Sequence, residues 1–127
     1  MNYQSITYPD VNNGLGCRVT LWVSGCPHHC KGCHNQHTWD PDSGNEFTVD
    51  VKQQLMDILQ LPYIKGLTIS GGEPLALYNL VKVSKLVEEC KIRFPEKDIW
   101  LYTGYTLEAL EDDDIDVKRV VISKYYI

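Results

Sequence analysis

Residues 18–39 read RVTLWVSGCPHHCKGCHNQHTW, an apolar run that leads directly into three closely spaced cysteines. The run Arg18–Ser24 is short and rich in apolar residues, and it predicts a buried strand. Cys26, Cys30 and Cys33 follow this strand in a C-x3-C-x2-C pattern. Three thiolates that lie so close in the sequence can bind one soft metal centre. The stretch therefore predicts a strand whose carboxyl end leads into a metal site.

The number of cysteines in this loop indicates an open metal site. Each iron of a four-iron cluster normally takes one protein ligand, so three thiolates leave one iron without a thiolate. Such an iron keeps positions where a small molecule can bind and react, which argues for catalysis. The alternative is a structural zinc site, in which one imidazole closes a tetrahedron with the three thiolates. The loop offers four histidines for that role, namely His28, His29, His34 and His37.

Length, composition and charge describe one ordinary domain. A chain of 127 residues is long enough for one hydrophobic core and too short for two, so we expect a single domain over residues 1–127. Hydrophobic residues make up 43% and charged residues 23%, which argues against a disordered chain. The net charge of −5, without any Lys/Arg-rich stretch, argues against nucleic acid as a partner. Neither a signal-peptide pattern nor a membrane-span length is present, so we expect a cytoplasmic protein without a membrane partner.

Strand-like and helix-like segments alternate along the chain. Strands are predicted over residues 18–24, 66–70, 98–103 and 118–123. Helices are predicted over residues 50–61, 80–94 and 106–110, the first capped by Asp50 and ended by Pro62. Alternation of this kind predicts an α/β fold with a parallel sheet and right-handed crossovers.

A second motif follows the second predicted strand. Ser70 is followed by Gly-Gly-Glu-Pro at residues 71–74, which we call the glycine turn. In parallel α/β folds the loops after the carboxyl ends of the strands build the active site. We call the stretch with the three cysteines, Gly25–Trp39, the cysteine loop. The cysteine loop, the glycine turn and residues 102–105 after the third strand should therefore face one opening. The glycine turn alone is a weak signal, but its pairing with the cysteines favours the iron–sulfur interpretation over zinc.

The two motifs and their order resemble the radical S-adenosylmethionine superfamily, and within it the branch that activates anaerobic ribonucleotide reductase. The similarity covers Asn13–Arg18, the pattern GCxHxCxGCxNxxTW across Gly25–Trp39, and Phe94–Tyr105. It implies a small, incomplete βα barrel of parallel strands. It also implies a chain that is short at its C-terminus, because relatives continue into Asp-Gly-Lys and Arg-Gly-Ser segments.

The resemblance implies two cofactors and a set of ligands for them. Cys26, Cys30 and Cys33 would hold a [4Fe-4S] cluster, and S-adenosyl-L-methionine would bind the fourth iron through its amino and carboxylate groups. The implied contacts to this cofactor come from Gly32, Cys33, His34, Ser70, Gly71, Gly72 and Glu73. The two glycines of the turn would let backbone groups approach the methionyl ammonium, and Glu73 would offer an acceptor or countercharge. No side chain is expected to act as an acid or base, since the cluster and the cofactor carry the chemistry.

The implied activity is that of an oxidoreductase that activates a glycyl-radical enzyme. Reductive cleavage of S-adenosylmethionine would give methionine and a 5′-deoxyadenosyl radical, which takes a hydrogen atom from a glycine of the large reductase subunit. Flavodoxin or ferredoxin is the implied electron donor. Two alternatives stay open, namely activation of another glycyl-radical enzyme of the pyruvate formate-lyase type, and a non-catalytic iron–sulfur or zinc-binding interaction module.

Several residues outside the two motifs have structural interpretations. Cys90 lies on the apolar stripe of its helix and Cys17 precedes the first strand, so we expect both thiols to be structural. The aromatic residues Trp100, Tyr102 and Tyr105 are interpreted either as contacts for adenine or a peptide substrate, or as core packing.

Overall fold

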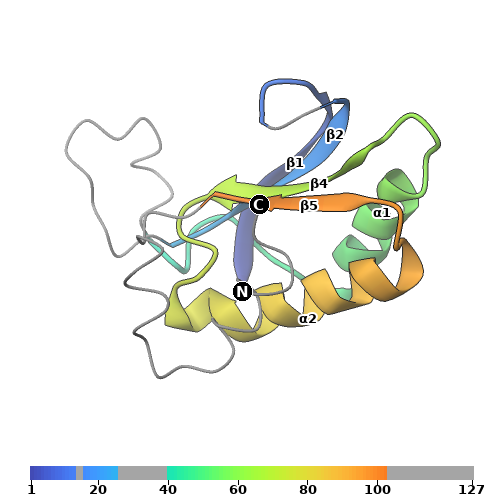
Figure 1. Ribbon diagram of the computed structural model, residues 1–127. Coiled ribbons are helices and arrows are strands. Elements are labelled where there is room, and N and C mark those ends of the chain that lie inside the picture. Colours follow the sequence, from blue (N-terminus) through green and yellow to red (C-terminus); the bar gives the residue numbers. More distant parts are fainter. Residues whose placement is uncertain (14–15, 26–39, 103–127) are drawn as a thin grey trace, which may run out of the picture.

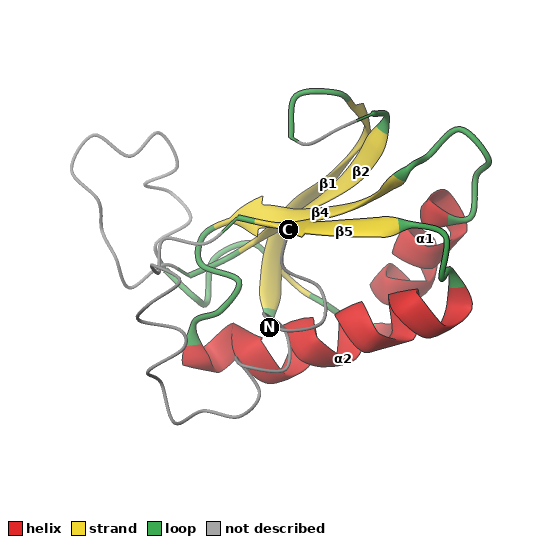
Figure 2. Cartoon of the chain, viewed as in Figure 1, coloured by secondary structure: helices red, strands yellow, loops and turns green. Residues whose placement is uncertain are grey.

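The described residues form a five-stranded sheet with two helices packed against it (Figure 1; Figure 2). The computed structural model describes residues 1–13, 16–25 and 40–102. Within these ranges the strands are arranged in the order β3-β1-β2-β4-β5. The elements are β1 (Asn2–Asp10), β2 (Arg18–Val23), β3 (Asn45–Glu46), α1 (Val49–Leu59), β4 (Gly66–Gly71), α2 (Leu77–Arg93) and β5 (Asp98–Leu101).

The parallel part of the sheet agrees with the prediction. β2 pairs with β4 and β4 pairs with β5, both in parallel, with α1 and α2 as the connections between them. The three strands lie where they were predicted, although β5 ends two residues early, at Leu101. The predicted strand 118–123 and helix 106–110 lie outside the described residues.

The N-terminal strand was not predicted, and it makes the sheet mixed rather than parallel throughout. β1 pairs antiparallel with both β2 and β3. Its side chains are half-buried or exposed, and its pairing with β2 shifts register twice, between Tyr3 and Ser5 and between Thr7 and Asp10. A strand of this kind lacks the regular alternation of apolar residues by which strands are recognised in a sequence.

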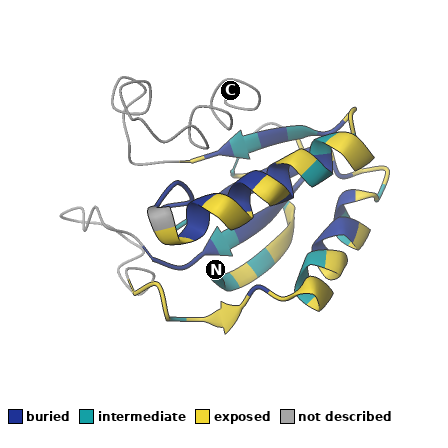
Figure 3. Cartoon of the chain, turned by 90° about the horizontal axis from the view of Figure 1, so that it is seen from below, coloured by how far each residue is buried: buried dark blue, intermediate teal, exposed yellow. Residues whose placement is uncertain are grey.

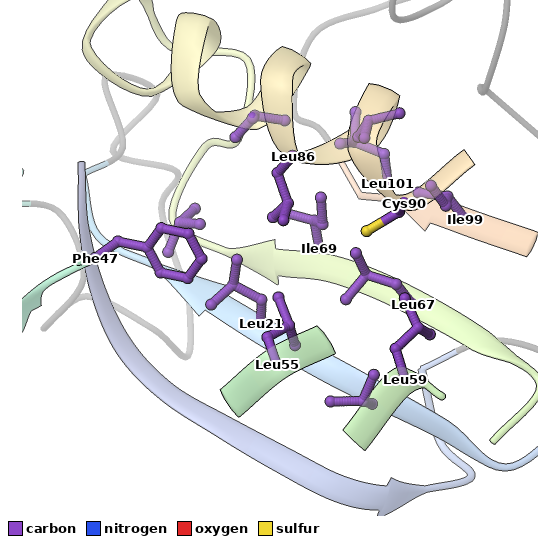
Figure 4. Close-up of a cluster of buried hydrophobic side chains, with 14 of the residues drawn as sticks. Leu21, Phe47, Leu55, Leu59, Leu67, Ile69, Leu86, Cys90, Ile99 and Leu101 are labelled. Carbon is purple, nitrogen blue, oxygen red and sulfur yellow. The ribbon is translucent and has the colours of Figure 1, made fainter. Parts of the chain in front are cut away.

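Both helices pack on the same face of the sheet and enclose the core (Figure 1; Figure 3). Alternate residues of the strands point into this core, as Leu21, Ile69 and Leu101 show, and side chains such as Leu55 of α1 and Leu86 of α2 meet them (Figure 4). The apolar stripes of the helices therefore hold them against the sheet, with their polar faces outward.

The first turn of α1 differs from the prediction. Thr48 is the N-cap, because its hydroxyl accepts a hydrogen bond from the Val51 amide at 3.3 Å. Asp50, the predicted cap, lies instead in the first turn, where its negative charge interacts favourably with the helix dipole. The prediction of Asp50 as the cap was therefore wrong by two residues.

Candidate functional site

The carboxyl ends of β2 and β4 lie side by side, as the parallel arrangement predicts. Trp22 is opposite Ser70 and Val23 is opposite Gly71 in the sheet register. Two residues separate β2 from Cys26, and we call them, Ser24 and Gly25, the lead-in segment. The lead-in segment and the glycine turn therefore leave the sheet from neighbouring strands at the same edge (Figure 1).

Backbone hydrogen bonds join the lead-in segment to the glycine turn. The Gly72 amide donates to the Val23 carbonyl at 2.9 Å, and the Glu73 amide donates to the Gly25 carbonyl at 2.7 Å. These bonds continue the pairing of the two strands past the end of the sheet. The residue directly before Cys26 is thus fixed to the turn that was predicted to bind a cofactor.

Three glycines are needed where these two segments meet. Gly25 and Gly71 have φ angles of +91° and +102°, in the left-handed region that favours glycine. A Cβ atom on Gly72 would clash with the backbone of Gly25, and one on Gly25 would clash with the ring of Tyr78. The close approach therefore depends on the absence of side chains, and it leaves a cradle formed of backbone atoms.

The carboxylate of Glu73 stabilises its own turn. The residue is fully buried, and its Oε2 accepts a hydrogen bond from the Leu75 amide at 2.9 Å. This contact holds the turn in shape ahead of α2. The predicted role of Glu73 as an acceptor or countercharge for a ligand stays a prediction.

Two carboxamide side chains that the sequence interpretation missed also hold the lead-in segment. Asn79, in the first turn of α2, donates from Nδ2 to the Ser24 carbonyl at 2.9 Å and to the Glu73 carbonyl at 3.1 Å. Gln4 of β1 donates from Nε2 to the hydroxyls of Ser24 at 2.9 Å and Ser43 at 2.8 Å. A polar residue next to the apolar stripe of α2 is the signal that could have indicated Asn79, and β1 offered no such signal for Gln4.

The structure describes part of the predicted site. Ser70, Gly71, Gly72 and Glu73 lie together at the ends of β2 and β4. The proposed metal ligands Cys26, Cys30 and Cys33 lie outside the described residues, as do Gly32, His34 and Tyr105. The described part of the predicted site is therefore the glycine turn and the lead-in segment before the cysteines.

A buried polar network occupies the opposite, amino-terminal end of the parallel strands. Arg18 is fully buried and forms an ion pair with Asp98 at 2.6 Å between Nη1 and Oδ1. Its Nε donates to the Thr68 hydroxyl at 2.7 Å, and that hydroxyl donates to the Asn13 carbonyl at 2.6 Å. The polarity of this cluster has a structural explanation, because a buried guanidinium needs its charge paired and its donors used.

The aromatic residues of β5 and the residue after it lie on the sheet face away from the helices. The guanidinium of Arg18 lies 5.6 Å from the centroid of the Trp100 ring, within cation–π distance. Trp100 in turn contacts Tyr102 at 6.5 Å between ring centroids, and Tyr102 is 42% exposed. Trp100 is thus in part a packing residue, whereas Tyr102 keeps a surface on which another molecule can bind.

The environments of the two described cysteines support structural roles. Cys90 is buried against Met56, and burial, with a smaller contribution from Glu89, raises the pKa of its thiol to about 12. Cys17 is half-buried at the edge of the core, and its carbonyl accepts a hydrogen bond from the Lys65 amide at 2.7 Å. The expectation that Cys90 behaves as a small buried apolar residue is confirmed.

In the described part of the chain, neither helix combines the length and the apolar character needed to cross a membrane.

Comparisons with known proteins identify the family. Residues 12–125 match a family model described as a 4Fe-4S single cluster domain. A protein of Enterobacteria phage T4 is 46% identical over 125 residues, which cover 98% of this chain and 76% of the relative. Proteins of Vibrio cholerae (48% identical, covering 88% of this chain and 74% of the relative) and Haemophilus influenzae (45%, covering 87% and 73%) are similar as well. All three are named anaerobic ribonucleoside-triphosphate reductase-activating protein, and the chain belongs to this family.

Proposed function

We propose that this chain activates an anaerobic ribonucleoside-triphosphate reductase, as the names of its relatives state for them. In this proposal it is a radical S-adenosylmethionine enzyme that works as one partial-barrel domain over residues 1–127. The observation that carries the proposal is the hydrogen bond from the glycine turn to Gly25, the residue directly before Cys26. It brings the cofactor-binding turn and the start of the cysteine loop to one edge of the sheet.

The residue types of the cysteine motif and of the glycine turn fit an iron–sulfur cluster with one open iron. Cys26, Cys30 and Cys33 supply three soft thiolate ligands, which suit iron–sulfur clusters. Gly71 and Gly72 have no side chain that would occupy the space beside the turn, so a small polar group can approach their backbone atoms. When bound, the cluster and S-adenosylmethionine would supply reductive carbon–sulfur cleavage and the means to take a hydrogen atom from a glycine of the large reductase subunit.

The protein's own residues bind and orient these groups. Glycine at position 25 lets the chain leave β2 in the left-handed conformation that leads into Cys26. The buried carboxylate of Glu73 keeps the glycine turn rigid, so that Ser70, Gly71 and Gly72 present their backbone groups in one arrangement. In this proposal Gly32, Cys33 and His34 contact the adenine end of the cofactor.

The exposed side chain of Tyr102 marks the sheet face that we assign to the reductase peptide. This face lies opposite the helices and begins at the same edge as the glycine turn, so a glycine-containing loop bound here would reach the cofactor. Flavodoxin or ferredoxin remains the proposed electron donor.

The decisive experiment uses anaerobically purified full-length protein together with the large reductase subunit. With dithionite and S-adenosylmethionine we expect release of 5′-deoxyadenosine and a glycyl-radical signal on the subunit in electron paramagnetic resonance. Zinc in place of iron would overturn the proposal in favour of a structural metal module. Release of 5′-deoxyadenosine without a glycyl signal would exclude the reductase as the substrate.

A matched pair of cysteine variants tests the ligand assignment. Cys30→Ala should lose the iron–sulfur absorbance and all release of 5′-deoxyadenosine. Cys90→Ala should keep both, because Cys90 is buried in the core between α2 and the sheet. Full iron content in Cys30→Ala would contradict the assignment of Cys30 as a ligand.

A further inference from the structure

Ser24 is the residue on which the contacts around the cysteine loop converge. It is fully buried, and each of its polar atoms has a partner from a different part of the chain. Its amide donates to the Asn2 carbonyl at 3.0 Å, its carbonyl accepts from Asn79, and its hydroxyl accepts from Gln4. Because three hydrogen bonds to different segments restrain Ser24, its backbone has little conformational freedom. The segment that leads into Cys26 therefore starts from a fixed point.

Asn79 connects this fixed point to the glycine turn. Its Nδ2 carries two hydrogens, and it donates to carbonyls of two different segments, that of Ser24 on the lead-in segment and that of Glu73 on the glycine turn. The side chain is 1% exposed, so a carbonyl that lost this donor would find no water to replace it. A carboxylate of the same shape has no donor to offer, which makes the amide specifically suited to this position.

Gln4 connects the two ends of the cysteine loop. Its Nε2 donates to Ser24, two residues before Cys26, and to Ser43, which follows the loop. Nearby, the Asn2 side chain donates to the Asp42 carbonyl at 3.1 Å. β1 therefore holds both ends of the segment that contains the three cysteines.

We infer that Asn79 and Gln4 are positioning residues for the cofactor site. Asn79 sets the lead-in segment against the glycine turn, and Gln4 holds the two ends of the cysteine loop together. The consequence for the cofactor rests on the proposed function, in which the loop binds the cluster and the turn binds S-adenosylmethionine. Loss of Asn79 then weakens binding of S-adenosylmethionine, because a cofactor that bridges both segments depends on their relative position.

Hydrogen–deuterium exchange on the full-length, cluster-free protein tests the structural part directly. In Asn79→Asp we expect the amides of Gly72 and Glu73 to exchange at least about tenfold faster, while amides of α1 and β5 keep their protection. Ser84→Ala is the matched control, since Ser84 lies on the same helix and its buried hydroxyl has no hydrogen-bond partner among the described residues. A uniform increase across the chain, or no change at the glycine turn, would overturn the inference.

A parallel variant tests the other carboxamide. Gln4→Ala should accelerate exchange of the Ser24 and Ser43 amides. The Gly72 and Glu73 amides of the glycine turn should exchange more slowly in this variant than they do in Asn79→Asp. Equal effects of both variants at all four amides would show that the two side chains support the sheet in general and do not position separate segments. If Asn79→Asp does not fold, the same measurements are made on Asn79→Ala, with the same expected results.

Binding of the cofactor is measured separately on cluster-loaded protein. Asn79→Asp should raise the KM for S-adenosylmethionine about tenfold, with the iron content and kcat close to the wild type, and Ser84→Ala should leave all three unchanged. An unchanged KM would overturn the positioning role. Wild-type protein that binds no S-adenosylmethionine would overturn the proposed function instead, and the exchange result on cluster-free protein would stand independently of it.

Discussion

The two ends of the parallel strands β2, β4 and β5 are joined in different ways. At the amino-terminal end, side chains make the contacts, with the Arg18 guanidinium bonded to Asp98 and Thr68. At the carboxyl end, backbone atoms make them, with the Glu73 amide bonded to the Gly25 carbonyl where a Cβ atom on Gly72 would clash. One end thus depends on which side chains are present, and the other depends on side chains being absent.

This difference separates stability from function along the same strands. The ion pair between the buried Arg18 and the partly exposed Asp98 fixes the amino-terminal end and occupies the polar groups there. The carboxyl end keeps a backbone surface next to the start of the cysteine loop, and two carboxamides supply the rigidity that the glycines do not. Changes at the first end should therefore lower the free energy of unfolding alone, whereas changes at the second should also lower cofactor binding.

The largest expected effect is at the amino-terminal end. Arg18→Ala removes a fully buried side chain together with its bonds to Asp98 and Thr68, so we expect a loss of about 3 kcal/mol in the free energy of unfolding. Urea denaturation of the cluster-free protein measures it. The exposed Arg93 is the control, and Arg93→Ala should cost less than about 1 kcal/mol. Similar losses for both variants would contradict the importance of the buried pair.

Gly66 and Gly72 form a matched pair, because Gly66 begins β4 and Gly72 directly follows its last residue. A Cβ atom on Gly72 would clash with Gly25, and one on Gly66 would clash with Asp98 at the opposite end. Each Gly→Ala variant should lose about 2 kcal/mol of stability because the neighbouring backbone must move. Only Gly72→Ala should also lose binding of S-adenosylmethionine, by tenfold or more in a titration of cluster-loaded protein. Equal loss of binding in both variants would break the comparison.

The thiol of Cys90 distinguishes global from local loosening. With a pKa raised to about 12 by burial, about one molecule in ten thousand carries the thiolate at pH 8, so native protein should resist alkylation there. Arg18→Ala should speed alkylation of Cys90, because global unfolding becomes more frequent. Asn79→Asp should leave it slow, because only the carboxyl end loosens. Peptide mass spectrometry after iodoacetamide treatment resolves Cys90 from the other thiols.

The smallest effect concerns Asp10, at the end of β1 beside the Arg18 network. Burial alone would raise the pKa of Asp10, but hydrogen bonds from Asn12, Asn13 and Thr20 outweigh it and hold the pKa below its ordinary value. The contribution of the carboxylate to stability is thus present above the ordinary pKa of 3.8 and is lost as the pH falls through the lower, folded value.

Asp10→Asn should therefore lose less than about 1 kcal/mol at pH 7, since the group is partly exposed. The stability of the variant should also fall less steeply than that of the wild type as the pH is lowered, because the variant has no carboxylate to protonate at this position. Thermal melts between about pH 5 and about pH 2 measure the difference. A steeper fall in the variant would contradict the direction of the pKa shift.

Sequence reasoning found the parts of the fold that carry regular apolar patterns. The strands at residues 18–24 and 66–70 and the helix ending before Pro95 follow such patterns, and the structure has them close to the predicted bounds. β1 was missed because it is half-exposed and irregular in register, so that its pairing with β2, and not its own pattern, makes it a strand. The cap of α1 was misplaced because Thr48 and Asp50 are both acceptable caps, and backbone geometry decides between them.

The candidate site was predictable where it depends on motifs and unpredictable where it depends on distant partners. Parallel topology was enough to predict that Gly25 and the glycine turn meet, and their hydrogen bond confirms it. Gln4 and Asn79 were missed because their partners lie 20 and 55 residues away along the chain. A single carboxamide in a sequence gives no sign of which carbonyl or hydroxyl it will bind.

The bond from Gln4 to both Ser24 and Ser43 has a consequence for how this protein family can vary. Folding of the sheet brings those two serines together, so the entropy of closing the segment between them is lost at that step. Closure entropy grows slowly with length, by about 0.6 kcal/mol for each doubling. The sheet should therefore tolerate a longer sequence between Ser24 and Ser43 at little thermodynamic penalty.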